Sequence, residues 1–203
     1  MKMLNKIVIL GPESTGKSTL CEMLAQHYNT LWCPEFAREY LLTNGTDYTF
    51  DDLLTIAKGQ LALEEEYIQM SRTTAFSGGT RLPVAHHQRP STGDRLLFLD
   101  TDQYVMKVWC EYVFNDCHNW ILRRIAERTC DLYLLCKPDL PWVQDELREY
   151  PDEKPRQELY HIYRDLLVHQ GIRWIEISGD YDTRFEMARQ EVDNMLHKKI
   201  LPA

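Results

Sequence analysis

The residues that most directly indicate chemistry lie in one short segment near the N-terminus. Residues 11–18 read Gly-Pro-Glu-Ser-Thr-Gly-Lys-Ser and fit the pattern G-x-x-x-x-G-K-[ST] without a mismatch. In such a loop the glycines permit a tight turn that directs backbone N–H groups at phosphate oxygens. The lysine reaches the β- and γ-phosphates, and the serine hydroxyl is a ligand for Mg²⁺. The segment therefore predicts binding of a nucleoside triphosphate with magnesium.

We expect ATP and Mg²⁺ as the cofactors of this loop. An apolar run over residues 6–10 precedes the loop and an amphipathic pattern follows it, as a strand and a helix would. A glycine-rich turn with an incidental lysine is the alternative. The predicted nucleotide-binding residues are Gly11, Glu13, Ser14, Thr15, Gly16, Lys17, Ser18 and Thr19, of which Lys17 is also catalytic and Ser18 a metal ligand.

Two carboxylates follow another apolar run, over residues 96–99. Ligands of open α/β sheets bind at the carboxyl ends of the strands, so Asp100 is predicted to hold Mg²⁺ directly or through water. Asp102 is predicted to lie on the acceptor side as a second catalytic candidate. The alternative for Asp100 is a turn residue at the end of the strand, and for Asp102 a helix N-cap, a role that is compatible with the acceptor-side one.

A carboxylate and a guanidinium group follow a short apolar run over residues 30–33. Glu35 is a candidate general base that would take a proton from an acceptor hydroxyl. Arg38 lies one helical turn later, where it would hold an anionic acceptor group or position Glu35. The alternative is an ordinary surface ion pair of Glu35 with Arg38 or Glu39.

Residues 138–157 are rich in proline and charge, which is typical of a mobile lid. Arg148 and Arg156 would fold over the transferring phosphoryl group and exclude water, unless the segment is simply a solvated connection. Arg184 follows a glycine-bearing turn and is predicted to stack on the adenine ring. The alternative there is a plain loop with Asp182 or Thr183 as the N-cap.

The hydrophobic pattern predicts the strands and helices that carry these residues. Short apolar runs alternate with longer helical patterns, which predicts an α/β fold of three layers with a mainly parallel sheet. The five expected strands cover residues 6–10, 30–33, 96–99, 132–136 and 174–177. We expect one domain over residues 1–203. Residues 73–95 lack periodicity and predict a long loop that is disordered, a substrate-side flap or a partner contact.

Composition limits the function classes further. The 203 residues carry a formal net charge of −8, which argues against a general nucleic-acid-binding protein. No apolar run is long enough to span a membrane, and the N-terminal apolar run is too short for a signal peptide. Six cysteines without a C-x-x-C pair indicate reduced thiols. We therefore expect a cytoplasmic protein with neither a nucleic-acid nor a membrane partner; the oligomeric state is left open.

Taken together, the motifs resemble the ribosylnicotinamide kinase domain of bacterial multifunctional NAD-salvage regulators. The resemblance depends on Gly-Pro-Glu-Ser-Thr-Gly-Lys-Ser-Thr (11–19), Pro-Glu-Phe-Ala-Arg-Glu-Tyr (34–40), Phe-Leu-Asp-Thr-Asp (98–102), W-V-x-D-x-x-R (142–148) and Arg156. It implies a P-loop kinase fold and the ATP-dependent phosphorylation of nicotinamide riboside to nicotinamide mononucleotide. The alternatives are a kinase of another nucleoside or nucleotide, and a regulatory P-loop ATPase.

The same resemblance implies roles for residues on the acceptor side. Glu35, Arg38 and Asp102 would face the riboside, and Trp142 would contact the nicotinamide ring. The regulators also carry an adenylyltransferase domain with an H-x-G-H motif, and some carry a DNA-binding helix-turn-helix. We identify neither in this sequence, where His86 and His87 are not followed by Gly-His. We therefore expect this chain neither to make NAD from the mononucleotide nor to bind operator DNA.

Overall fold

The computed structural model describes residues 4–73, 95–127, 130–148, 150 and 152–198, and in these ranges it has a single five-stranded sheet. All neighbouring strands pair in parallel, in the order β2-β3-β1-β4-β5. The strands are β1 (Leu4–Leu10), β2 (Leu31–Cys33), β3 (Arg95–Asp100), β4 (Leu132–Cys136) and β5 (Trp174–Ile177). The predicted parallel α/β sheet is confirmed.

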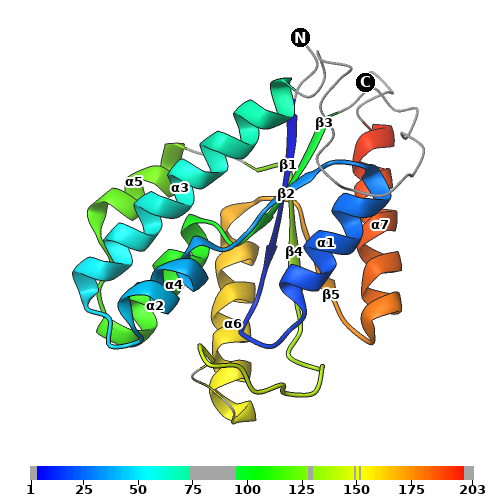
Figure 1. The fold of residues 1–203 in the computed structure, drawn as a ribbon. Helices are drawn as coiled ribbons and strands as arrows, with labels where there is room; N and C mark the ends of the chain where they lie inside the picture. The colour runs from blue at the N-terminus through cyan, green and yellow to red at the C-terminus, as the bar shows by residue number, and fades with distance from the viewer. Residues whose placement is uncertain (1–3, 74–94, 128–129, 149, 151, 199–203) are drawn as a thin grey trace.

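Helices cover both faces of the sheet and so make three layers (Figure 1). Helices α1 and α7 pack on one face, while α3, α4 and α6 pack on the other. The helices are α1 (Lys17–Tyr28), α2 (Phe36–Asn44), α3 (Phe50–Thr73), α4 (Gln103–Phe114), α5 (Asn119–Glu127), α6 (Glu153–Gln170) and α7 (Tyr181–Lys198). Helices α2 and α5 extend the second layer away from the sheet by packing on α3 and α4.

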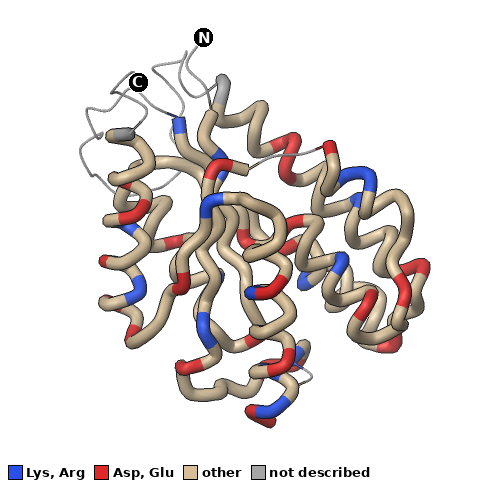
Figure 2. The backbone as a smooth tube through the Cα atoms, turned by 180° about the vertical axis from the view of Figure 1, so that it is seen from behind, with Lys and Arg blue, Asp and Glu red and all other residues tan. Residues whose placement is uncertain are grey.

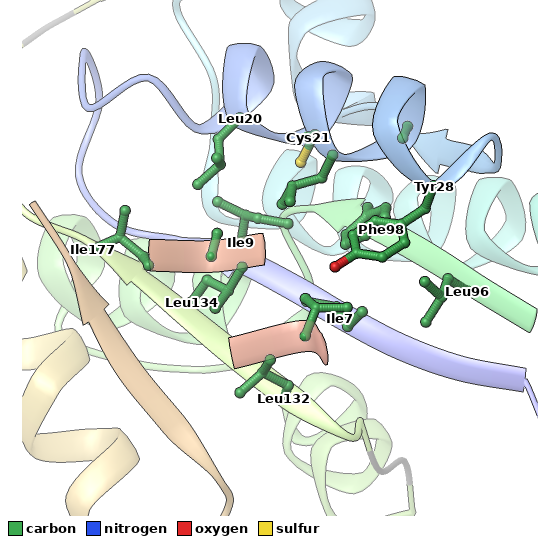
Figure 3. Packing of buried hydrophobic residues seen from close by; sticks show 14 of the residues in the cluster. Ile7, Ile9, Leu20, Cys21, Tyr28, Leu96, Phe98, Leu132, Leu134 and Ile177 are labelled. Carbon is green, nitrogen blue, oxygen red and sulfur yellow. The ribbon is translucent and has the colours of Figure 1, made fainter. Parts of the chain in front are cut away.

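The central strand explains why its sequence is a continuous apolar run. Successive side chains of a strand point to opposite faces, and here both faces are covered. Ile7 and Ile9 pack with Phe98 beneath α1 (Figure 3), whereas Val8 and Leu10 pack toward α4 and α6. Each such side chain is fully or almost fully buried, which stabilises the fold by about 1.5–3 kcal/mol per residue. The strand that leads into the phosphate loop is therefore rigidly held.

Local signals in the sequence set several helix ends as predicted. Thr49 and Asp52 form a capping box, in which the Thr49 N–H donates to Asp52 (2.8 Å) and the Asp52 N–H donates back (3.3 Å). Gly171, at a φ of +64°, ends α6. The predicted lid reaches residue 157, but its last residues form the first turn of α6, which begins at Glu153. Of the predicted loop at 73–95, residues 74–94 lie outside the described ranges.

Charge is spread over the surface rather than collected on one side. Figure 2 shows lysines and arginines interspersed with aspartates and glutamates over the visible helices and loops. Among the helices of the described ranges, none is both long enough and apolar enough to span a membrane.

Candidate functional site

The phosphate loop follows β1 at the carboxyl end of the sheet, at the lower end of the view in Figure 1. Gly11 has a φ of +142°, and a Cβ there would lie 2.6 Å from the carbonyl oxygen of Cys136. Only glycine fits that position, because a side chain would strain the backbone and collide with β4. The loop is thus packed against the neighbouring strand, with its open side toward a cavity.

Within the loop, two side chains hold the backbone in a tight turn. The hydroxyl of Thr15 donates to the carbonyl of Pro12 (2.8 Å), and the ammonium group of Lys17 donates to the same oxygen (2.9 Å). Residues 11–19 all line a cavity of about 570 Å³. The predicted residues of the phosphate loop are therefore together in one place, at the N-terminus of α1, where a helix favours anions.

The loop meets the end of β3 through Ser18 and Asp100. The Ser18 hydroxyl donates to Asp100 Oδ2 at 2.5 Å. Asp100 is 1% exposed, and its Oδ1 has no hydrogen-bond partner among the described residues. Burial raises the pKa of this carboxyl, while the charge of Lys17 and the bond from Ser18 lower it. An unpartnered buried carboxylate oxygen beside a hydroxyl fits Mg²⁺, which takes oxygen ligands and keeps several waters.

Glu35 lies on the same cavity, directly before α2. Burial, and after it the charge of Asp100, raises the pKa of Glu35 to about 7, against the opposing charges of Lys17 and Arg38. A carboxyl group that titrates near neutrality is a suitable proton acceptor at physiological pH. The structure thus brings this candidate base to the phosphate loop.

Asp102 has a different place from the one predicted. It caps α4 by accepting a hydrogen bond from the Tyr104 N–H (2.9 Å), and its other oxygen accepts from the Tyr133 hydroxyl (2.7 Å). Burial raises the pKa of Asp102 to about 6. It does not line the large cavity. Of the two readings of the sequence, the helix N-cap is the one found, and Asp102 contacts the start of α4 rather than the acceptor space.

The lid segment, defined here as the described residues 137–148, 150 and 152, contacts the phosphate loop. The Val143 N–H donates to Ser14 Oγ (3.1 Å), and an Arg148 nitrogen approaches the same oxygen at 3.4 Å. The Tyr150 N–H donates to the Glu13 carboxylate (2.5 Å). The lid segment is therefore held against the phosphate loop, and Arg148 lines the cavity.

Arg38 connects the lid to the acceptor side of the cavity. Its two terminal nitrogens donate to the two oxygens of Asp145 at 3.1 and 3.0 Å. This planar, two-bond arrangement suits a guanidinium–carboxylate pair. Arg38 lines the cavity, but its charge is matched by Asp145 in the lid rather than held free for an anionic acceptor.

Trp142 is also placed differently from the prediction. The indole does not line the cavity; Arg148 and Arg156 lie over it, 5.9 and 5.5 Å from the ring centroid. Arg156 is 6% exposed and belongs to the first turn of α6. It likewise lies outside the cavity lining, behind Trp142.

Arg184 is buried beneath the loops and cannot stack on a nucleotide base. It is 1% exposed, donates to the backbone carbonyls of Gly179, Thr15 and Lys137, and pairs with Asp139. The helix that carries it begins at Tyr181, and Asp180, rather than Asp182 or Thr183, accepts the capping bond from a backbone N–H. Arg184 therefore ties together the loops that support the cavity.

Sequence reasoning missed the aromatic side chains of the cavity. Tyr181 is 46% exposed at the start of α7 and borders the phosphate loop. On the acceptor side, Val105, Trp109 and Tyr112 form one stripe of α4 that lines the cavity together with Tyr163 of α6. Their helical spacing was the available signal, but the same spacing is typical of a buried core face.

Residues 6–184 match the model of a family described as an AAA domain. The chain belongs to this AAA domain family. It is also 26% and 25% identical, over 195 residues, to the trifunctional NAD biosynthesis/regulator proteins NadR of Escherichia coli K12 and Salmonella typhimurium LT2. Those matches cover 94% of this chain but 42% of each relative, so the chain spans less than half their length.

Solved structures show the same fold for this AAA domain protein. A NadR protein in complex with NR matches with a TM-score of 0.70 at 22% identity, over 95% of this chain and 50% of that one. A NadR protein in complex with NAD and AMP-PNP matches with a TM-score of 0.67 at 21% identity, covering 95% and 49%. Thymidylate kinase from Ehrlichia chaffeensis matches with a TM-score of 0.61 at 12% identity, covering 93% and 98%. The P-loop kinase-like fold and the resemblance to NAD-salvage regulators are confirmed.

Proposed function

We propose that this chain is an ATP-dependent kinase that phosphorylates nicotinamide riboside to nicotinamide mononucleotide. The observation that carries the proposal is the shared cavity, which joins a phosphate loop, the Ser18–Asp100 pair and Glu35 to an aromatic acceptor space. The NadR matches, one of them a structure in complex with NR, support the choice of substrate.

The nucleotide would bind with its phosphates on residues 11–19. Lys17 would release the Pro12 carbonyl and reach the β- and γ-phosphates. Ser18 and Asp100 would hold Mg²⁺, which supplies charge neutralisation at the phosphate oxygens when bound. Beside the loop, the exposed ring of Tyr181 and the apolar Pro141 offer surfaces for the base.

The aromatic acceptor space favours a nucleoside whose base carries positive charge. Trp109, Tyr112 and Tyr163 line this space, and a pyridinium cation is attracted to aromatic rings. Glu35 adds a carboxyl group nearby, whereas the positive charge of Arg38 is already matched by Asp145. Nicotinamide riboside has a cationic base of this kind, while the common nucleosides have neutral ones.

The reaction follows from the placement of Glu35 and the lid. Glu35 would accept the proton of the riboside 5′-hydroxyl as that oxygen attacks the γ-phosphorus. The bond to the bridging oxygen of ADP then breaks, and Lys17 and Arg148 stabilise the charge that develops on the phosphates. Closure of the lid would keep water away from the γ-phosphate, so transfer to the riboside prevails over hydrolysis.

The proposal includes the remaining predictions: one domain over residues 1–203, a cytoplasmic location, and neither a nucleic-acid nor a membrane partner.

A second candidate, a kinase of another nucleoside or of a nucleotide, is favoured by the likeness to thymidylate kinase. A regulatory ATPase is the third.

A panel of acceptors tests these candidates against each other. Purified protein is incubated with ATP, Mg²⁺ and either nicotinamide riboside, nicotinic acid riboside, thymidine, thymidine monophosphate or no acceptor. ADP release and the mass of the product are measured. We expect turnover with nicotinamide riboside at least about tenfold above thymidine and thymidine monophosphate, whose bases are neutral, because one lost cation–π contact costs roughly 1–2 kcal/mol. Preference for another acceptor would reject the substrate, and equal ADP release without acceptor would favour the ATPase.

A further inference from the structure

Ser14, the fourth residue of the phosphate loop, has a backbone conformation that is unfavourable for a residue with a side chain. Its φ is +56°, in the left-handed region where glycine, asparagine and aspartate are the usual residues. The turn itself would therefore form more easily with glycine at this position. Any advantage of serine over glycine here lies in its hydroxyl group.

The oxygen of the Ser14 hydroxyl accepts hydrogen bonds from the lid segment. The Val143 N–H donates to Oγ at 3.1 Å, and Nη1 of Arg148 lies 3.4 Å from the same atom. The same Nη1 also donates to the Val143 carbonyl, so these three residues form one closed cluster. A backbone amide and a guanidinium group of the lid thus converge on one oxygen atom of the phosphate loop.

The hydrogen atom of this hydroxyl is still available. A serine hydroxyl has two acceptor lone pairs and one donor hydrogen, and the two lid contacts use the lone pairs. Within the described ranges the Ser14 hydroxyl donates to no acceptor, and Ser14 lines the cavity together with Lys17. An ionised phosphate oxygen only accepts hydrogen bonds, so a nucleotide in the loop would supply the acceptor that this hydrogen lacks.

We propose that Ser14 is a positioning residue that couples the bound nucleotide to the lid: its hydrogen is donated to a phosphate oxygen of ATP while its oxygen holds the Val143 amide. The inference rests on the proposed kinase function. A hydroxyl that donates its hydrogen to an anion becomes a better acceptor, so a bound phosphate strengthens the hold on the lid. The lid segment then excludes water when the phosphates are in place.

Ser14→Gly separates this role from the structure of the turn. The variant removes the hydroxyl but suits the backbone better, so it should unfold at the same temperature as the wild type or at a higher one. With the lid less firmly held, ADP release without acceptor should rise at least about threefold relative to phosphorylation of nicotinamide riboside.

Asn29→Gly is the matched control for this kinetic test. Asn29 has a positive φ of 49° and lies outside the cavity lining, so the ratio of hydrolysis to transfer should stay at the wild-type value. The same ratio in Ser14→Gly as in the wild type would overturn the proposal. So would an equal rise in both glycine variants, because it would come from backbone freedom rather than from the lost hydroxyl.

Amide hydrogen exchange detects the lid contact without turnover. The Val143 N–H is protected by its bond to Ser14 Oγ, so its exchange, followed by NMR, should be at least about fivefold faster in Ser14→Gly than in the wild type. The Thr49 N–H, which donates to Asp52 in the capping box of α3, is the internal control. Equal exchange of the Val143 amide in the two proteins would refute the contact.

The same measurement tests the coupling to the nucleotide. AMP-PNP with Mg²⁺, at concentrations that saturate each protein, should slow Val143 exchange at least about threefold in the wild type and less than about 1.5-fold in Ser14→Gly. Equal slowing in both proteins would contradict the coupling. If AMP-PNP slows this exchange in the wild type but no acceptor is phosphorylated, the proposed function alone fails. If calorimetry detects no binding of AMP-PNP, both proposals fail.

Discussion

Ser18 and Asp100 are joined by a hydrogen bond of 2.5 Å, although 82 residues separate them in the chain. The bond links the first turn of α1 to the end of β3 and leaves one buried carboxylate oxygen, Asp100 Oδ1, without a partner in the described ranges. The pair thus fixes the two residues of the proposed magnesium site relative to the phosphate loop.

Asp100→Asn should therefore impair the use of magnesium. The amide removes the negative charge that Mg²⁺ prefers, so kcat should fall by about 10²-fold or more and the Mg²⁺ concentration for half-maximal rate should rise. The rate is measured over a magnesium titration, with the exposed Asp47→Asn as control. An unchanged titration curve would remove Asp100 from the metal site.

The general-base role of Glu35 predicts a specific pH profile. Because burial and Asp100 raise the pKa of Glu35 to about 7, the reactive carboxylate form grows as the pH rises, and kcat/KM should rise between about pH 6 and pH 8. Glu35→Gln should be about 10²–10⁴-fold slower and should lack this rise. A variant that keeps the wild-type profile would show that another group takes the proton.

The same carboxyl group should make the folded protein less stable as the pH rises, whereas it should make catalysis faster. Its pKa is about 7 in the folded protein against 4.5 as the ordinary value. The protonated form is favoured by folding, so this contribution is complete below about pH 4.5 and is lost as the pH rises through about 7. Urea unfolding at pH 5 and pH 8 should thus show a smaller decrease in stability for Glu35→Gln than for the wild type. An equal decrease in both proteins would contradict a raised pKa.

The ion pair of Arg38 and Asp145 should act on lid closure more than on stability. Arg38→Asp and Asp145→Arg should each lower kcat/KM by about threefold to tenfold, and the double exchange should recover most of that loss. Unfolding free energies should change by less than about 1 kcal/mol, since the Arg38 side chain is half exposed. Losses that simply multiply in the double variant would exclude coupling between the two residues.

Variants of Arg184 and Tyr181 should show that Arg184 has a structural role and Tyr181 a role in binding ATP. Arg184→Ala removes the ion-pair partner of Asp139 and the donor to several loop carbonyls, so the free energy of unfolding should fall by about 3 kcal/mol. Tyr181→Ala should leave stability nearly unchanged and raise KM for ATP by about threefold to tenfold, with Tyr181→Phe as the control. A normal KM for ATP in Tyr181→Ala would place the base elsewhere.

The fold and the phosphate-loop side of the candidate site could be predicted from the sequence, and the reasons are physical. Strands buried on both faces are continuous apolar runs, and the carboxyl ends of parallel strands meet at one edge, so Asp100 could be placed beside Ser18 in advance. The capping box at Thr49 is likewise a local signal. Such features depend on near neighbours in the chain or on one general rule of the sheet.

The rest of the site depends on contacts that no local pattern specifies. Arg184 meets Asp139 from 45 residues away, and Arg38 meets Asp145 from 107 residues away. Their exposure and partners exist only after the loops have packed. Trp109 and Trp142 show the same limit, because an aromatic residue on a helix or in a lid has equal reason to pack inward or to meet a ligand.

The most direct test of the central claim is a single-turnover measurement of nicotinamide mononucleotide formation, with enzyme in excess over ATP and riboside. If the phosphate loop transfers a phosphoryl group to the riboside, the wild type should form one molecule of nicotinamide mononucleotide per ATP. In Lys17→Ala the rate should be at least about 10²-fold lower at unchanged thermal stability. ATP consumed without mononucleotide, or equal rates in the two proteins, would contradict the claim.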